Sequence, residues 1–309
     1  MESFPTGSIA PSQNMYLSIP YSHEDESIMR RRFKTANKVA WHLMNSGPST
    51  QGPAVFSPIS MSHSIEAEVE ERQGHEFWMA QDLPYLDNGW ADALIVVTAG
   101  GWRESTGVTA ELQKAREMGI PVFSFDPIRA LDLVGISGKK RAGKDTMGDV
   151  FAEYGYEQYA FAGPIKDICA DTFLLSDEQL DGDRKEEEDP FWGLSPREIM
   201  QKIGSEAFRD TFGKNVWVDS LLQRIRLELP PKAVVTDVRL PNELRGILSA
   251  GGDVIRIDAS ERLSHDDDHH TETALDGVPD NEYDHVVLNN NTLADFLHVS
   301  RRIVEQHYA

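Results

Sequence analysis

Apolar runs alternate with amphipathic stretches throughout the first 125 residues. Residues 93–97 (ALIVV) form an apolar run without polar interruptions, which is typical of a parallel strand buried on both faces. Other stretches repeat apolar side chains every three or four positions, the spacing of a helix with one buried face. The pattern predicts strands at 15–19, 55–56, 93–97 and 121–125, and helices at 28–44, 75–86 and 108–118. Strands that alternate with helices favour a parallel, doubly wound sheet.

A second set of the same kind follows a short connector at 126–132. It predicts strands at 131–136, 233–236 and 254–257, and helices at 147–154, 196–212 and 293–307. The helix at 196–212 begins with a capping box formed by Ser195 and Glu198. The sequence therefore predicts an α/β protein with two doubly wound parallel-sheet domains, at 15–127 and 131–309, after a flexible N-terminus at 1–14.

The composition limits the class of protein. The chain has 309 residues, and its 51 Asp and Glu outnumber 30 Lys and Arg to give a net charge of −21. No apolar run approaches the roughly 18 residues that a bilayer span needs, and the N-terminus lacks the pattern of a signal peptide. Cys169 is the single cysteine, which excludes internal disulfides and cysteine-based zinc sites. We therefore expect an intracellular, cytoplasmic protein without a membrane partner.

The acidic balance also limits the ligands. It argues against a nucleic-acid polymer, because neutralising a phosphate backbone needs a basic surface, whereas one phosphate group needs only a few local donors. Residues 177–189 hold eight acidic and two basic residues, which predicts a solvated, mobile insertion. The run at 266–270 (DDDHH) has the composition of a metal cluster but lacks EF-hand spacing, and we expect it to be solvated.

The strongest chemical signal lies at 138–146 (GKKRAGKDT), between an apolar run and a predicted helix. It matches the phosphate-binding pattern G-x-x-x-x-G-K, with Thr146 one position later than usual. Glycines let the backbone wrap around a phosphate, and the following helix adds a positive dipole. Lys144 is placed to bridge the β- and γ-phosphates of ATP. The alternative is a Gly- and Lys-rich surface turn, which the flanking strand and helix disfavour.

Four further motifs accompany this loop. They are YAFAGPIK at 159–166, PREIMQKIG at 196–204, TDVRLPNE at 236–243 and HTE at 270–272. With them, about residues 131–300 resemble the bacteriophage deoxynucleoside monophosphate kinase family. The resemblance implies a phage-encoded enzyme of the host cytoplasm, which uses ATP and Mg²⁺ to phosphorylate a deoxynucleoside 5′-monophosphate (dNMP).

The kinase resemblance also implies roles for particular residues. Lys144 and Arg141 act on the ATP phosphates, and Asp237 contacts magnesium or the acceptor unless it is a plain strand-end turn residue. The expected ATP-phosphate site comprises Gly138, Lys139, Arg141, Gly143, Lys144, Asp145 and Thr146, the last two also holding magnesium or its water. The expected acceptor site and its lid comprise Lys166, Arg197, Gln201, Arg239, Arg262, His270 and Glu272. A solvated surface position is the alternative for each acceptor-site arginine.

The first half carries its own motifs: YLSIPYS at 16–22, FSPI at 56–59, DLPYL at 82–86 and STGVTAEL at 105–112. About residues 15–125 resemble the nucleoside 2-deoxyribosyltransferase-like family, which includes deoxynucleotide N-glycosidases. The resemblance implies four roles. Glu111 attacks the anomeric carbon, Asp82 protonates or holds the base, Tyr16 orients Glu111, and Ser105 contacts the 5′ side of the sugar.

One departure from this second family concerns the 5′-phosphate. Members that hydrolyse monophosphates carry an arginine just after the first strand, where this chain has PYSH at 20–23. His23 and Arg103 are the candidate substitutes. A first domain without activity, which only binds a nucleotide, is therefore an alternative to an N-glycosidase.

We predict a two-domain enzyme whose second domain makes deoxynucleoside diphosphates from dNMP and ATP, and whose first domain cleaves or transfers an N-glycosidic bond. Two alternatives stay open: a kinase with an inactive first domain, and a nucleotide-sensing regulatory protein that binds ATP without phosphoryl transfer. The nucleoside 2-deoxyribosyltransferase-like family commonly completes its site from a neighbouring subunit, so a homo-oligomer is one expected arrangement. The sequence does not distinguish the preferred base.

Overall fold

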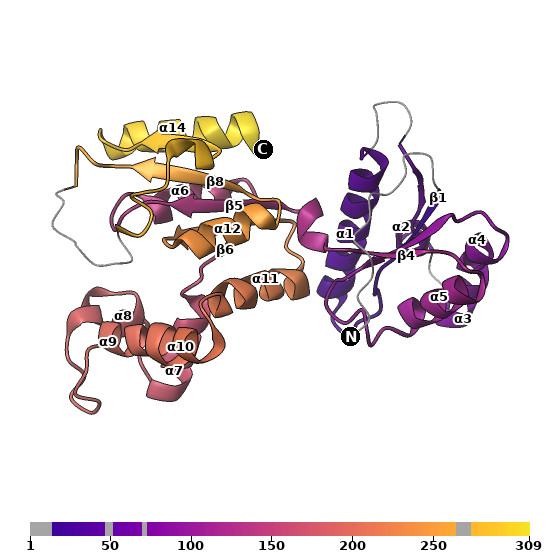
Figure 1. Cartoon of the computed structure of the whole chain (residues 1–309), viewed down its shortest axis with the longest axis horizontal. Coiled ribbons are helices and arrows are strands. Elements are labelled where there is room, and N and C mark those ends of the chain that lie inside the picture. Colours follow the sequence, from indigo (N-terminus) through magenta and orange to yellow (C-terminus); the bar gives the residue numbers. More distant parts are fainter. Residues whose placement is uncertain (1–13, 47–51, 70–72, 264–272) are drawn as a thin grey trace. The chain divides into compact units, whose positions relative to one another are not determined.

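The computed structural model describes residues 14–46, 52–69, 73–263 and 273–309 (Figure 1). The chain divides into two compact units. The first runs to Leu131 and includes Ile225–Pro231, and the second comprises Asp132–Arg224 and Lys232–Ala309. Each unit is built on one parallel sheet with helices around it, which confirms the predicted α/β class. No helix within the described ranges is long and apolar enough to cross a membrane.

The first unit has a four-stranded sheet with the order β2-β1-β3-β4, in which every pair is parallel. The strands are β1 (Asn14–Ser18), β2 (Ala54–Phe56), β3 (Ala93–Val97) and β4 (Val122–Phe125). Successive side chains of a strand point to opposite faces. Accordingly Met15 and Leu17 belong to one buried cluster, and Tyr16 belongs to another with Leu94.

Five helices of the first unit are described. They are α1 (Glu26–Met44), α2 (Pro58–Glu66), α3 (His75–Asp82), α4 (Pro84–Asp87) and α5 (Thr106–Glu117). The single helix predicted at 75–86 is in fact two, because Pro84 starts a new helix instead of continuing α3. Ser105 is the N-cap of α5 and Gly119, with φ of +68°, follows its C-terminus.

The second unit has a five-stranded parallel sheet with the order β6-β7-β5-β8-β9. The strands are β5 (Asp132–Ser137), β6 (Glu157–Tyr159), β7 (Lys232–Val238), β8 (Asp253–Asp258) and β9 (His285–Leu288). The chain leaves β5 toward β6 and β7 on one side and later adds β8 and β9 on the other. Ligands of such sheets bind outside the carboxyl end of the strand where this reversal occurs.

Helices cover both faces of this second sheet. Helices α6 (Lys144–Glu153) and α14 (Leu293–His307) pack on one face through Phe151 and Phe296, and α12 (Pro241–Ser249) lies on the opposite face (Figure 1). A smaller helical group comprises α7 (Gly163–Phe173), α8 (Asp177–Leu180), α9 (Pro196–Gln201), α10 (Asp210–Phe212) and α11 (Val216–Glu228). The short 3₁₀ turns are η1 (Pro127–Ala130), η2 (Asp183–Glu186) and η4 (Asp280–Glu282).

The helix predicted at 196–212 begins as expected but does not stay α-helical. The capping box of Ser195 and Glu198 is present at its start. From Lys202 to Arg209 the chain forms a π-helix, η3. The carbonyl of Gly204 accepts a hydrogen bond at 2.9 Å from the indole N–H of Trp217, which competes with the regular i+4 partner.

The segment 177–189, predicted as a solvated, mobile insertion, is mostly exposed as expected, but it has regular structure and one core residue. The segment contains α8 and η2, and Ser176 forms a capping box with Gln179. Leu180 is only 4% exposed and packs in one cluster with Ile165 and Ile199. One well-placed leucine therefore fixes a segment whose overall composition favours solvation.

Candidate active sites

The phosphate-binding loop joins β5 to α6 at the carboxyl edge of the second sheet. Lys144 is buried, and its ammonium donates hydrogen bonds to the carbonyls of Gly138 at 2.6 Å and Lys139 at 2.8 Å. Arg141 and Gly143 both have left-handed backbone, with φ of +63° and +106°. The loop thus curls around a positive charge at the N-terminus of a helix, the arrangement that binds phosphate.

Two side chains from later in the sequence hold this loop from outside. The amide of Asn289 donates to the carbonyl of Ala142 at 2.8 Å. The guanidinium of Arg262 donates to the carbonyls of Arg141 at 2.8 Å and Asn289 at 3.1 Å. Arg262, expected in a lid, therefore contacts the phosphate loop itself. The other two expected lid residues, His270 and Glu272, and the run at 266–270 lie outside the described residues.

Gly143→Ala is expected to weaken ATP binding at least about tenfold and to destabilise the second unit by about 1–3 kcal/mol. An added Cβ would lie 2.7 Å from Nδ2 of Asn289 and 2.8 Å from the ring of Phe296, in a backbone conformation unfavourable for alanine. Calorimetry would measure both quantities. Gly155→Ala is the matched control, because Gly155 also has positive φ (+85°) but meets nothing within 4 Å. Equal losses of ATP affinity in both variants would contradict the expectation.

A cavity of about 330 Å³ opens beside this loop, at the carboxyl ends of β5, β7 and β8. Its size fits a small ligand such as a nucleotide portion. Arg239 and Arg256 are charged lining residues, and the buried Tyr283 ring, with Arg256 over it at 5.6 Å, closes one wall. Lys139 lies at the rim and pairs with Asp276 at 3.0 Å. Asp258 and Asp276 also line it, and Arg256 pairs with Asp280 at 3.0 Å, so the cavity carries charges of both signs next to the loop.

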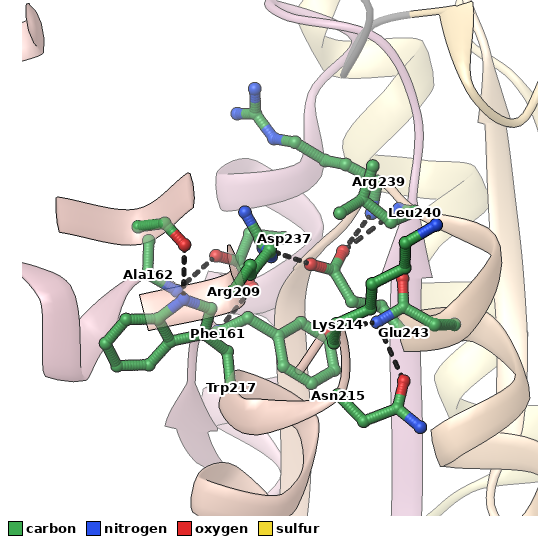
Figure 2. Close-up of polar contacts among 12 residues, drawn as sticks. Phe161, Ala162, Arg209, Lys214, Asn215, Trp217, Asp237, Arg239, Leu240 and Glu243 are labelled. Carbon is green, nitrogen blue, oxygen red and sulfur yellow. Dashed lines mark hydrogen bonds and ion pairs between the residues drawn. The ribbon is translucent and has the colours of Figure 1, made fainter. Parts of the chain in front are cut away.

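Asp237, near the end of β7, points toward the start of α7 (Figure 2). Its two carboxylate oxygens accept the backbone N–H groups of Phe161 at 2.7 Å and Ala162 at 3.0 Å. Burial raises the pKa of Asp237, while these N–H groups and the charges of Arg239 and Lys166 oppose the rise. The carboxylate thus fixes the segment that leads into Lys166.

Behind Asp237 lies a buried ion pair that the sequence did not reveal (Figure 2). Glu243 is 3% exposed, accepts the backbone N–H groups of Arg239 at 2.9 Å and Leu240 at 3.0 Å, and pairs with Arg209 at 3.3 Å. Burial raises the pKa of Glu243 to about 7, and the Asp237 charge adds to the rise. Glu243 therefore holds the backbone from which the Arg239 side chain extends.

The expected acceptor-site cations come from three elements. Lys166 on α7 pairs with Asp181, and Arg197 on α9 pairs with Glu186 at 2.6 Å. Gln201 is exposed one turn after Arg197. Lys185, which sequence reasoning missed, is half-buried in η2. Burial lowers the pKa of Lys185, and the nearby charges of Lys166, Arg197 and Arg239 lower it further. We call Lys166, Lys185, Arg197 and Arg239 the cation group.

In the first unit, Glu111 on α5 is buried over the end of β1. The hydroxyl of Tyr16 donates to one carboxylate oxygen at 2.8 Å, and the hydroxyl of Ser18 donates to the other at 2.5 Å. Burial raises the pKa of Glu111 to about 7 against these two hydrogen bonds, with a further rise from Asp82. The pKa of Tyr16 is raised by burial and by Glu111. Ser18 is a second donor that the resemblance did not supply.

A second carboxyl group, that of Asp82 at the end of α3, lies near this pair. Burial raises its pKa to about 6, and one of its oxygens has no hydrogen-bond partner in the described part of the chain. Ser105, expected at the substrate's 5′ side, accepts the backbone N–H of Val108 at 3.3 Å as the N-cap of α5. The site thus combines a held carboxylate with a second, buried carboxyl group.

The stretch after β1, which has no arginine of its own, receives one from α1. Arg32 is 7% exposed and donates to the carbonyls of Ser22 and Gly100, both at 2.8 Å. The two cations suggested by the sequence have other contacts: Arg103 lies 4.3 Å over the ring of Trp102, and His23 accepts the backbone N–H of Asp25. Arg32 is therefore the buried cation of this region, and it serves to join two loops.

The raised pKa values of the two buried carboxyls predict that the stability of the first unit depends on pH. Glu111 and Asp82 bind protons more tightly in the folded state than in the unfolded state. The resulting stabilisation is complete below the ordinary pKa values, 4.5 for Glu111 and 3.8 for Asp82. It is lost as the pH rises through the raised values, about 7 for Glu111 and about 6 for Asp82. For Glu111 the loss is on the order of 3 kcal/mol. We expect Glu111→Gln to flatten the fall of unfolding temperature between pH 5.5 and 8 in scanning calorimetry. Glu117→Gln, an exposed change on the same helix, should keep the wild-type slope; a wild-type slope in both variants would contradict the assignment.

A curled loop between the central strand of a parallel sheet and a helix, with a buried lysine at its centre, defines a P-loop phosphate-binding protein. The family model for deoxynucleotide monophosphate kinase matches residues 132–188 and 185–299, more than half of the chain. The chain therefore belongs to the deoxynucleotide monophosphate kinase family. Residues 13–127 match a domain of unknown function, DUF1937.

Individual relatives agree with the family model. The chain is 34% identical over 179 residues to a putative deoxynucleotide monophosphate kinase of Acanthamoeba polyphaga mimivirus, covering 53% of this chain and 91% of the relative. It is 29% identical over 150 residues to the deoxynucleoside-5′-monophosphate kinase of Escherichia phage T5, covering 46% of this chain and 57% of the relative. A solved dephospho-CoA kinase from Campylobacter jejuni matches 57% of this chain and 97% of its own, at 16% identity and a TM-score of 0.33.

Proposed function

We propose that the second unit transfers the γ-phosphoryl group of ATP to the 5′-phosphate of a dNMP. One observation carries the proposal. Arg239 lines the cavity beside the P-loop, and its charge acts on Lys185, so Arg239 connects the cavity to the cation group. A donor bound at the loop and an acceptor bound at the cation group would meet in that cavity. The kinase relatives of this unit support the same reaction.

Each part of the site has a role in this proposal. The N–H groups of the loop and Lys144 hold the ATP phosphates, with Gly138 and Gly143 allowing the close approach and Lys139 and Arg141 at the rim. The first turn of α6 offers the carboxylate of Asp145 and the hydroxyl of Thr146, oxygen donors of the kind that Mg²⁺ prefers. Asp237 fits the metal less well, because both its oxygens accept backbone N–H groups, and we assign it to positioning.

The chemistry of the transfer needs placement and charge more than proton transfer. An oxygen of the dNMP phosphate attacks the γ-phosphorus, the bond from that phosphorus to the β,γ-bridging oxygen breaks, and ADP leaves with its electron pair. Lys144 offsets charge that develops on the leaving group. Lys166, Arg197 and Arg239 hold the acceptor against the repulsion between two phosphates, and Gln201 is an uncharged donor beside them.

The test is direct. The purified chain is incubated with ATP, Mg²⁺ and each common or modified dNMP, and the diphosphate and ADP are separated by chromatography. We expect equal amounts of deoxynucleoside diphosphate and ADP with at least one acceptor. ATP binding without any diphosphate would instead favour the nucleotide-sensing alternative.

We propose a second function for the first unit, cleavage or transfer of the N-glycosidic bond of a deoxynucleoside or dNMP. It rests on the two hydroxyl donors that hold Glu111, with Asp82 as a second carboxyl whose raised pKa suits a proton donor. Glu111 would bond to the anomeric carbon while the base leaves with the proton of Asp82. Water, or a second base, would then release the sugar from Glu111. Free base in the same chromatograms supports this function, and its absence favours an inactive first domain.

A further inference from the structure

The acidic segment 177–189 is anchored between the two helices that carry acceptor-site cations. Leu180 of α8 packs against Ile165, next to Lys166 on α7, and against Ile199, two residues after Arg197 on α9. The bridge between Asp189 and Leu194 closes the segment back onto the start of α9. The charged side chains of the segment are therefore held beside the cation group.

Two carboxylates of the segment form ion pairs with cations of this group. Asp181 pairs with Lys166, and Glu186 pairs with Arg197. The two carboxylates are 61% and 62% exposed. Ion pairs of this exposure are worth about 0–1 kcal/mol, so an anion with two charges can displace them at little cost. Each pair places a carboxylate oxygen on a cation that the proposed function assigns to the acceptor phosphate.

Lys185 brings a further positive charge to these cations. It lies between the two pairing carboxylates in the sequence, and its ammonium has no hydrogen bond or ion pair with any residue in the described ranges. Of the charges that act on it, those of Lys166, Arg197 and Arg239 are positive and that of Asp181 is negative. A half-buried ammonium among cations is unfavourable until an anion arrives.

We infer that the acidic segment is part of the acceptor-phosphate site: Lys185 binds the 5′-phosphate of the dNMP, and Asp181 and Glu186 compete with that phosphate for Lys166 and Arg197. The inference rests on the proposed kinase function and adds to it a residue and a device that sets acceptor affinity. The expected ligand is a phosphate monoester dianion, since its two negative charges offset the excess positive charge of the cation group.

Lys185→Gln is expected to raise the KM for the best dNMP about tenfold, with the KM for ATP changed less than about twofold, because one charged hydrogen bond is lost from the acceptor alone. The neighbouring Arg184→Gln is the matched control, since Arg184 is exposed and pairs with Glu187 within the segment. Inhibition by the deoxynucleoside, which lacks the phosphate, should be unchanged in Lys185→Gln. A merely structural role would weaken the nucleoside and the dNMP alike.

The competing carboxylates are tested by the double variant Asp181→Asn, Glu186→Gln. We expect its KM for dNMP to fall a few-fold, while Glu187→Gln keeps the wild-type value. A KM that rises would show that the carboxylates position the cations, and would overturn the inference. A wild-type KM in Lys185→Gln would also overturn it and leave the proposed function intact, whereas a wild-type protein that makes no diphosphate overturns both.

Discussion

Replacing Lys144 with methionine is expected to lower the kcat for diphosphate formation by about two to three orders of magnitude. The ammonium is buried at the centre of the loop and donates hydrogen bonds to two loop carbonyls. When ATP binds, the ammonium exchanges these carbonyls for the β- and γ-phosphates at the same loop. Its loss removes stabilisation of the leaving ADP, a charge that develops only in the transition state, so kcat falls more than affinity. Single-turnover measurements with saturating ATP would isolate this step.

The control for this prediction lies in the same loop. Lys140 is exposed, and Lys140→Met removes an equal charge four positions earlier. We expect its kcat to stay within about threefold of wild type, since an exposed charge is screened by solvent and salt. Lys144→Met also leaves two loop carbonyls without a donor, at a cost of about 1–3 kcal/mol in stability. Calorimetry checks that the variant is folded under assay conditions. Activity in folded Lys144→Met above a tenth of wild type would refute the assigned role.

The P-loop could be predicted from the sequence because every part of its signal is local. The apolar run 131–136 becomes β5, the glycines supply the turn, and Lys144 begins α6. The same holds for the capping box at Ser195 and for the terminal helix, whose predicted range 293–307 agrees with α14. In each case the physics acts within a few residues along the chain, so no knowledge of the tertiary fold is needed.

The rest of the kinase site depends on contacts between distant segments. Glu243 reads as an ordinary first-turn residue of a helix, and only its approach to Arg209 makes it a buried ion pair. The regular structure of the segment around Lys185 was missed for a related reason. Composition measures the average tendency to be solvated, whereas the burial of Leu180 against α7 and α9 holds the segment in place. The π-helix η3 also depends on a distant segment. Its Gly204 carbonyl accepts a hydrogen bond from the Trp217 indole of α11.

In the first unit, one missed residue did leave a signal. Tyr16 and Ser18 are two positions apart on a strand, so their side chains share a face, and a role for Tyr16 at Glu111 implies that Ser18 is near as well. Arg32 left no such signal. It lies ten residues after Ser22, whose carbonyl it contacts, in a helix whose other arginines are more exposed. Its contact with that loop depends on the path of the chain between β1 and α1.

Replacing Glu111 with glutamine is expected to lower the rate of free-base release by at least about three orders of magnitude. Glutamine keeps the size of the side chain and can still hydrogen-bond with the hydroxyls of Tyr16 and Ser18, which act as donors or acceptors. It cannot form the bond to the anomeric carbon, so the covalent route closes. The measurement is chromatography of free base from deoxynucleosides and dNMPs, with Glu117→Gln as the exposed control on the same helix. Diphosphate formation by the second unit should be unchanged and serves as an internal check of the amount of intact protein.

A loss of base release could also arise from a distorted site, and two results separate the cases. Glu111→Gln should be inactive yet no less stable than wild type at pH 8, because the neutral amide avoids the charge that burial disfavours. In Glu111→Ala the space left by the carboxylate admits a small anion, and azide should restore base release by bonding to the anomeric carbon in its place. An inactive, destabilised Glu111→Gln without azide rescue of Glu111→Ala would assign Glu111 to the architecture of the first unit. If Glu111→Gln is stable but inactive and azide rescues Glu111→Ala, the carboxylate lies at the anomeric carbon. The cost of burying its charge is then explained by its role in the reaction.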